Sequence, residues 1–320
     1  MRASNLIAIA ARLPFFLLLV CVCARKSKVG GQAIIEGVMM RSKQKISWAV
    51  RKPNGETVVE RFPFISLAKR HKFLTIPVVR GSISLYESLK VGYKALARSA
   101  QIAGDELAAT SDSQKRSDAP AYVLSFSIAL VVCVGVFMYI PMLASQHFFK
   151  NSVFAFNGFA GTLRIVLFLL YLLVIGCWKD IRRVFEYHGA EHKAIFAFED
   201  GKELTVETMR GYSTLHPRCG TSFLLLVAIV CIFLFTIIDS LVTMLAGPYP
   251  NVPSRLLVHV MLIPIVAGCS YEVLRISDRF QHAWPVRFFI LPGLWLQKIT
   301  TREPNDEQLK IASAALKASL

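Results

Sequence analysis

Five side chains of the kinds that bind metals fall within one polar stretch between two long apolar runs. His188, Glu191 and His192 form the pattern H-x-x-E-H, and His216 and Cys219 follow in the sequence His-Pro-Arg-Cys. Residues four apart on a helix share one face, so the two histidines of the first pattern are placed to hold one cation with the glutamate beside them. This spacing is that of the inverzincin motif, in which the histidines bind Zn²⁺ and the glutamate activates water.

The second pair, His216 and Cys219, adds two ligand types that favour zinc. Four protein ligands would form a closed structural site, whereas three ligands and an open position would permit catalysis, and the spacing does not distinguish these two cases. Each residue also has a plainer interpretation. His188 would then bond a backbone carbonyl, His216 would be a turn residue before a proline, and Cys219 would be a small buried residue at a helix start.

The composition indicates that these residues belong to a membrane protein. Of the 320 residues, 54% are hydrophobic and 18% are charged, and the mean hydropathy is +0.48. A soluble domain has a charged share of about 25%. The formal net charge of +16 suggests anionic partners, but the sequence contains no nucleic-acid-binding module, so we expect membrane lipids and no nucleic acid. The sequence identifies no protein partner.

Four apolar runs are each close to the length of about 20 residues that a helix needs to cross a bilayer. They cover residues 121–144, 163–178, 222–246 and roughly 256–274, and the second is short. Lysine and arginine are concentrated before the first run, between the second and third, and after the fourth. By the positive-inside rule, both termini and the histidine-rich loop face the cytoplasm of a bacterium, or the stroma if the membrane is that of a plastid.

The fold class that we predict is an all-α polytopic membrane protein with about four transmembrane helices and a small cytoplasmic α+β element at the N terminus. Runs rich in β-forming residues at 46–50 and 57–62 flank an Asn-Gly turn, which predicts a β-hairpin. Apolar residues at helical spacing over 78–102 predict an amphipathic helix, either on the membrane surface or packed on the hairpin. The Gly-Gly pair at 30–31 marks a tight backbone approach or a turn.

We divide the chain into four regions. They are an apolar extension or targeting segment at 1–27, a basic cytoplasmic region at 28–117, a four-span domain at 118–274 with its polar loop at 179–221, and a cytoplasmic interfacial segment with a C-terminal helix at 275–320. The first region contains an apolar run too short to cross a membrane, and we favour an extension over a signal or transit segment or an interfacial anchor. Residues 105–119 have the composition of a solvated linker.

Four blocks in order along the chain carry a resemblance to a known family. The blocks are GGQAIIEGVMMR at 30–41, YHGAEHK at 187–193, HPRCGTSF at 216–223, and PGLWLQ at 292–297 followed by TTREP at 300–304. They resemble the signature of the YqhQ family, whose members are bacterial and plastid integral membrane proteins usually described as predicted metal-dependent enzymes without a settled activity. The resemblance runs from Gly30 to the C terminus. It implies the same membrane architecture and a site for Zn²⁺ or another divalent metal.

The resemblance also draws in Glu36 and Arg41, which composition alone does not single out. Glu36 is either a further metal ligand or the partner of a cation such as Arg41 in a plain salt bridge. Glu272, at the cytoplasmic end of the fourth run, is another candidate ligand because a carboxylate at a membrane boundary requires a cation. Asp239 and His259 lie deeper in the apolar runs, toward the opposite face. Ionisable groups there are functional candidates by default, and the alternative is that these two simply lie near the far interface.

Four arginines flank the candidate metal site in the sequence, namely Arg182, Arg183, Arg210 and Arg218. If they converge, they would bind the phosphate or carboxylate of a headgroup or nucleotide substrate. If they do not, they serve to set the membrane topology.

We therefore predict a zinc-dependent membrane hydrolase acting on a lipid or a membrane-associated peptide. His188, His192 and either His216 or Cys219 would bind the metal, and Glu191 would be the general base. The alternative is a non-enzymatic scaffold or assembly factor in which the same residues form a closed structural site. A transporter is less favoured because no pair of broken spans in related halves is evident. The sequence lacks a P-loop and a GxSxG elbow, which argues against nucleotide hydrolysis and serine-hydrolase chemistry.

Overall fold

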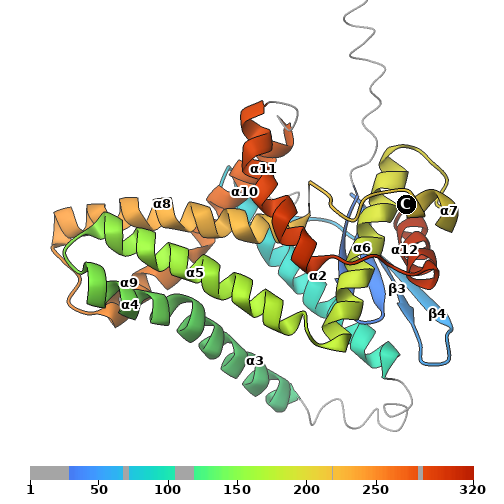
Figure 1. Cartoon of the computed structure of the whole chain (residues 1–320), viewed down its shortest axis with the longest axis horizontal. Helices are drawn as coiled ribbons and strands as arrows, with labels where there is room; N and C mark the ends of the chain where they lie inside the picture. The colour runs from blue at the N-terminus through green and yellow to red at the C-terminus, as the bar shows by residue number, and fades with distance from the viewer. Residues whose placement is uncertain (1–28, 68–71, 105–118, 218, 280–283) are drawn as a thin grey trace, which may run out of the picture.

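The computed structural model describes residues 29–67, 72–104, 119–217, 219–279 and 284–320. The predicted extension at 1–27 lies outside the described residues, as does the predicted linker except for its last residue. Long helices lie along the long axis of the molecule, and a small sheet with its covering helices lies at one end (Figure 1).

A four-stranded antiparallel sheet, in the order β1-β2-β3-β4, forms that end of the molecule. The strands are β1 (Gly30–Ile34), β2 (Gly37–Arg41), β3 (Lys45–Arg51) and β4 (Thr57–Pro63). Strands β3 and β4 are the predicted hairpin, and Gly55 in their turn has a φ of 86°, which glycine adopts at little cost. Strands β1 and β2 were not predicted from the sequence. The Gly-Gly pair lies in β1, where its second residue, Gly31, marks a tight approach rather than a turn.

Helices cover both faces of this sheet. Helix α6 (Lys179–Glu199) and helix α12 (Asp306–Ser319) cover one face, and helix α2 (Val79–Ala103) covers the other. In β2, Val38 and Met40 pack toward α6 and α12, whereas Met39 packs toward α2, as the alternation of side chains along a strand requires. The amphipathic helix predicted over 78–102 is therefore α2, and it packs on the sheet.

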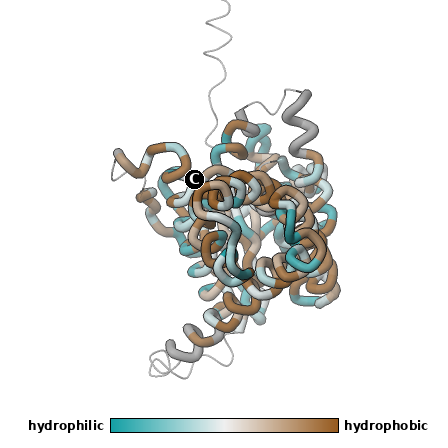
Figure 2. Tube along the Cα trace, turned by 90° about the vertical axis from the view of Figure 1, so that its left-hand side faces the viewer, coloured by the Kyte–Doolittle hydropathy of each residue, from teal (hydrophilic) through white to brown (hydrophobic). Residues whose placement is uncertain are grey.

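Three helices are long and apolar enough to cross a membrane, or four if a bent pair counts as one span. The first candidate span, Ser127–Phe149, lies within α3 (Ala119–Val134), a π-helical turn (Gly135–Tyr139) and α4 (Ile140–Phe149). The second is α5 (Val153–Ile175), and the third is Leu225–Ala246 within α8 (Gly220–Ala246). The bent pair consists of α9 (Val252–Met261) and α10 (Ile263–Arg279), and its bend is 50°. Apolar segments dominate the bundle viewed along its length (Figure 2). These features fit a membrane protein.

The structure corrects three predicted boundaries. The first span continues to Phe149 instead of ending at residue 144. The second is not short, because α5 begins at Val153, where the Ser152 side chain caps it by accepting a hydrogen bond from the backbone of Ala155. The fourth predicted run is not one straight helix, since it bends between α9 and α10. Asparagine, glycine and arginine in the first half of α5 lower its hydropathy, which hid its start in the sequence.

The C-terminal part contributes the remaining helices near the site. Helix α7 (Val206–Arg210) follows α6, and helix α11 (Trp284–Thr300) contains the segment predicted to be interfacial and packs against α8. The predicted C-terminal helix is α12, which begins at a capping box formed by Asn305 and Gln308. Together α6, α11, α12 and the start of α8 surround the histidine-rich region.

Candidate metal centre

Helix α6 places the H-x-x-E-H motif in the interior of the protein. His188 and His192 lie one turn apart, and their rings are 4.4 Å apart between centroids. Gly189 lies between them, and a Cβ added to it would lie 2.0 Å from the backbone oxygen of Arg302. Only glycine allows the chain after α11 to approach the motif this closely.

Three potential ligands meet at this point. One ring nitrogen each of His188 and His192 and the Sγ of Cys219 lie within 4.8 Å of one another, and all three residues are buried. Cys219 reaches the group because it is the N-cap of α8. We call these three residues the His-His-Cys group.

Backbone carbonyls orient both imidazoles of the group. Nδ1 of His188 lies 2.8 Å from the carbonyl oxygen of Thr300, and Nδ1 of His192 bonds the carbonyl of Thr214. Because a carbonyl only accepts, each Nδ1 carries a proton, so the neutral form of each ring has its lone pair on Nε2. Metal-binding histidines are commonly held in this way. The plainer interpretation of His188, a bond to a backbone carbonyl, is thus compatible with metal binding.

The Nε2 atoms of the two histidines differ in their contacts. Nε2 of His188 lies 3.0 Å from Sγ of Cys219. Nε2 of His192 is buried and has no hydrogen-bond partner among the described residues. Burial also lowers the pKa of His192, which favours the neutral ring that a metal requires. A metal bound by the group would satisfy this nitrogen.

The position of Cys219 favours its thiolate. Its Sγ caps α8 by accepting a hydrogen bond from the backbone N–H of Thr221 at 3.4 Å. Although burial raises it, the influence of the neighbouring His192 and Thr221 outweighs burial and lowers the pKa of Cys219 below its ordinary value. The thiolate is the form of cysteine that binds metals.

Glu191 is buried beside the group, and strand β1 covers it. A Cβ added to Gly31 would lie 2.8 Å from Oε1 of Glu191, and the Gly31 backbone N–H donates to the carboxylate. Burial raises the pKa of Glu191 to about 8, and His188 opposes the shift. A carboxyl group that changes its protonation near neutral pH therefore lies next to the candidate metal ligands.

His216 lies close to the group but faces another residue. Its ring centroid is 5.5 Å from that of His192, and its Nε2 is 3.6 Å from a carboxylate oxygen of Glu199. The buried side chain of Gln297 holds the His216 backbone, because its Oε1 accepts from the His216 N–H at 2.7 Å and its Nε2 donates to the His216 carbonyl at 2.8 Å. We did not assign Gln297 a role from the sequence. It lies 81 residues from His216, and only its place in the block PGLWLQ singled it out.

The flanking arginines are not gathered around the group by the described structure. Arg183 and Arg210 each form an ion pair, Arg210 with Asp306. Arg182 is exposed on α6, and Arg218 lies outside the described residues. An anion bound by Arg183 or Arg210 would compete with a carboxylate that is already present.

The two further family-motif residues, Glu36 and Arg41, form ion pairs with different partners. Glu36 pairs with Arg183, while Arg41 lies 3.4 Å from Glu87. Glu36 lies in the two-residue turn between β1 and β2 and has a φ of 51°. A left-handed conformation costs a non-glycine residue about 1 kcal/mol, and here it aims the carboxylate at α6.

Glu272 lies outside the His-His-Cys group and binds a cation of α2. Its Oε1 accepts from Nε of Arg80 at 2.7 Å, and the second oxygen accepts from the same guanidinium. The expected cation partner at the membrane boundary is thus an arginine. This ion pair joins α2 to α10.

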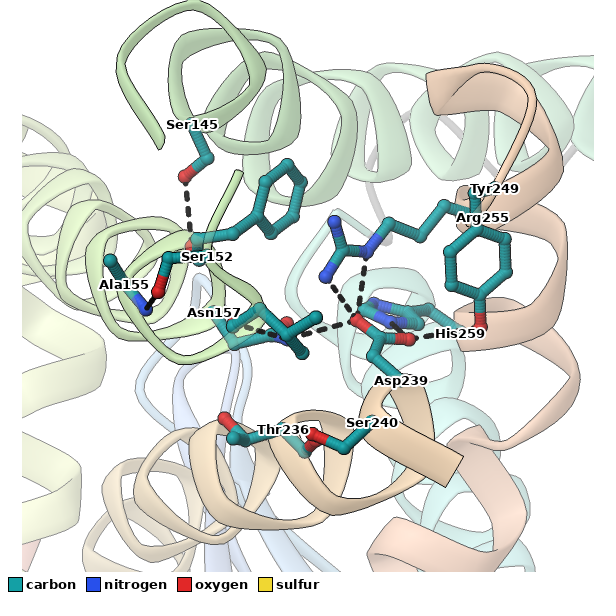
Figure 3. Close-up of polar contacts among 12 residues, drawn as sticks. Ser145, Ser152, Ala155, Asn157, Thr236, Asp239, Ser240, Tyr249, Arg255 and His259 are labelled. Atoms are coloured by element: carbon teal, nitrogen blue, oxygen red, sulfur yellow. Dashed lines mark hydrogen bonds and ion pairs between the residues drawn. The ribbon is translucent and has the colours of Figure 1, made fainter. Parts of the chain in front are cut away.

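A second buried polar cluster lies among the candidate spans (Figure 3). Asp239 of α8 accepts from Nε of Arg255 at 2.7 Å, and it lies 3.0 Å from Nε2 of His259. Asn157 of α5 and the hydroxyl of Tyr249 donate to the same carboxylate at 2.9 and 3.0 Å. These contacts join α5, α8 and α9, so we interpret the cluster as a structural link that stabilises the packing of these helices.

The fold and the site define a helical protein with three or four helices able to cross a membrane, a sheet at one end and a buried His-His-Cys group. Residues 76–320 match the family described as "Protein of unknown function (DUF1385)", and the chain belongs to this family. It is 31% identical over 294 residues to "Uncharacterized protein YqhQ" of Bacillus subtilis (strain 168), covering 88% of this chain and 89% of that protein. No solved structure matches the chain. The resemblance to the YqhQ family is confirmed.

Proposed function

We propose that this protein is an integral membrane hydrolase that uses Zn²⁺ or another divalent metal and acts on a lipid or a membrane-associated peptide. The observation that carries the proposal is the His-His-Cys group with Glu191 buried beside it. The distribution of lysine and arginine favours an orientation with both termini and the group on the cytoplasmic side.

The residues of the group suit a divalent metal of intermediate softness. Nε2 of His188, Nε2 of His192 and Sγ of Cys219 would be the ligands, and two nitrogens with one sulfur favour zinc over magnesium or calcium. Three protein ligands leave one position of a tetrahedral site for water or substrate, which is the arrangement of catalytic zinc sites.

Bound Zn²⁺ would supply a Lewis acid and lower the pKa of water at the open position. Glu191 is placed to accept the proton of the attacking water, since a general base works best when its pKa lies near the working pH. The Gly31 N–H orients this carboxylate, and β1 shields it from bulk water. The neighbouring positive charge of a metal would lower the pKa of Glu191 and favour the ionised base.

Elemental analysis of the detergent-purified protein tests the metal site. We expect about one metal per chain in the wild type and close to none in His188→Ala or Cys219→Ala, because a site with two ligands left binds weakly. The matched control is His147→Ala, which removes an exposed histidine on α4. Absence of bound metal from the wild type, even after incubation with Zn²⁺, would sink the proposal.

The variant Glu191→Gln separates catalysis from metal binding. We expect it to keep its metal and to lose hydrolysis of reconstituted membrane lipids or peptides, with products measured by mass spectrometry. Loss of the metal and of the fold in this variant would contradict the role of general base.

A structural site is the second candidate function, and the position of His216 favours it. With its ring 5.5 Å from that of His192, a modest shift would make His216 a fourth ligand and give a scaffold or assembly factor with a closed site. X-ray absorption at the metal distinguishes the two. Two nitrogens, one sulfur and one oxygen support the enzyme, whereas three nitrogens and one sulfur support the scaffold.

A further inference from the structure

A basic hollow lies at the end of the candidate span α5, next to the metal centre. Its volume is about 450 Å³, and its lining includes Leu172 and Leu173 of α5, Arg182 of α6, Lys298 of α11, and Arg302 just beyond α11. Three cations from two separate parts of the chain therefore face one hollow, and among the described residues no carboxylate lines it.

The three cations of the hollow differ from the ion-paired arginines nearby. Arg182, Lys298 and Arg302 are exposed, and their side chains form no hydrogen bond or ion pair within the described parts of the chain. By contrast, Arg183, the next residue of α6, pairs with Glu36, and Arg210 pairs with Asp306. Topology alone accounts for basic residues near a span, but it does not require three of them to share one hollow.

The other wall of the hollow is apolar and belongs to the membrane domain. Leu172 and Leu173 lie in the last turn of the candidate span Val153–Ile175. A ligand that fills the hollow would therefore contact cations on one side and the apolar side chains of Leu172 and Leu173 on the other. A phospholipid has both features, because its phosphate is anionic and its acyl chains are apolar.

The same short segment connects the hollow to the metal centre. Between Lys298 and Arg302, the carbonyl of Thr300 holds the ring of His188. The backbone N–H of Arg302 donates to the carbonyl of Phe185 on α6 at 2.9 Å. A headgroup bound in the hollow would thus lie beside the helix turn that carries the metal ligands.

We propose that the hollow binds the phosphate of an anionic membrane phospholipid through Arg182, Lys298 and Arg302, with an acyl chain along Leu172 and Leu173. As a statement about the substrate class, this inference rests on the proposed function, because it places a lipid headgroup next to the metal. Guanidinium groups suit this ligand, since they bind phosphate oxygens in pairs.

Native mass spectrometry of the full chain with dioctanoyl phosphatidylglycerol tests the proposal. We expect saturable binding to the wild type and a loss on the order of tenfold or more in Arg182→Gln/Lys298→Gln/Arg302→Gln, because each charge-assisted contact to phosphate contributes about tenfold. The control Lys202→Gln/Lys310→Gln/Lys317→Gln removes the same charge from exposed positions outside the hollow and should bind as the wild type does. If the triple variant is unstable, the single variant Arg182→Gln, at an exposed position, replaces it in the test, and we expect it to show a smaller loss of binding.

Three outcomes would overturn the proposal. The first is equal binding of the lipid by the triple variant and its control. The second is equal binding of dioctanoyl phosphatidylcholine, which would indicate that the leucines alone hold the lipid. The third is equally tight binding of inorganic phosphate, which would indicate a site for a soluble anion. Metal content is measured on the same samples as a separate result. A wild type that holds its metal but does not bind the lipid would therefore reject the lipid site alone and leave the metal site standing.

Discussion

At the scale of single residues, the protonation of Glu191 is the feature that the surroundings alter most clearly. Burial beneath β1 raises its pKa from 4.5 to about 8. Between these pH values, the Glu191 carboxyl of the metal-free folded chain therefore keeps its proton, whereas the same carboxyl in the unfolded chain has released it. The folded state binds more protons across this window, so the free energy of unfolding falls as pH rises from about 4.5 to about 8.

We predict that Glu191→Gln removes this pH dependence. In protein freed of metal with a chelator, the melting temperature of the wild type should fall more between pH 5 and pH 8 than that of the variant, because glutamine does not titrate. Glu203→Gln, at an exposed position, should behave as the wild type. Parallel curves for the wild type and Glu191→Gln would show that the carboxyl is not protonated in the folded chain.

A second prediction at this scale concerns Gln297, whose side chain holds the backbone of His216. Gln297→Ala should weaken metal affinity by about 10 to 100 fold, the usual effect of losing a residue that orients ligands. Competition with a fluorescent zinc chelator measures this, with Gln146→Ala on α4 as the exposed control. An unchanged affinity would mean that the loop before Cys219 is held without the amide.

At the scale of elements, the metal centre depends on how closely β1 and the end of α11 approach α6. Glycines permit both approaches. The Cβ position of Gly31 is 2.8 Å from Glu191 and from the backbone oxygen of Met39, and that of Gly189 is 2.0 Å from the backbone oxygen of Arg302. Backbone oxygens do not move as the end of a flexible side chain does, so substitution at either glycine shifts an element.

The neighbouring glycines of β1 provide a matched test. We predict that Gly31→Ala lowers the free energy of unfolding by about 1–3 kcal/mol, the usual cost of overpacking, and also reduces metal content. Gly30→Ala should change the free energy of unfolding by less than about 0.5 kcal/mol, since nothing lies within 4 Å of the Cβ position of Gly30. Chemical unfolding in detergent measures both. Equal effects of the two substitutions would argue against close packing of β1 on Glu191.

At the scale of the whole molecule, helix α8 connects two buried polar clusters. It begins after Cys219 and carries Asp239 twenty residues further on, which corresponds to about 30 Å along a helix. The metal centre therefore lies at one end of the helical bundle and the Asp239 cluster toward the other. We expect the two clusters to be energetically separate.

Removal of the carboxylate of the second cluster should destabilise the fold without affecting the metal. Asp239→Ala leaves Arg255 buried without its counter-charge, which costs about 3–5 kcal/mol. Thermal unfolding should show this loss, while metal content stays at the wild-type level, and Glu203→Ala should have little effect on either. Loss of metal together with retained stability would reverse our assignment of roles to the two clusters.

Several features were predictable from local patterns. The H-x-x-E-H spacing placed both histidines on one face of a helix, the hydropathic runs located the apolar helices, and the Asn-Gly turn located the hairpin of β3 and β4. Strands β1 and β2 were missed because each has only five residues, and β2, which is buried on both faces, lacks a clear alternation. The start of α5 was missed because polar residues that face other helices lower its hydropathy.

The sequence by itself determined which residues are able to bind a metal, and that His188, Glu191 and His192 share one helix. Only the tertiary structure decided that Cys219 joins the two histidines while His216 faces Glu199, and that Gly31 covers Glu191. It also paired Glu36 with Arg183 across 147 residues and left Arg182 free to meet Lys298 and Arg302. Spacing along a helix specifies neighbours three or four residues apart, whereas these contacts depend on how distant elements pack.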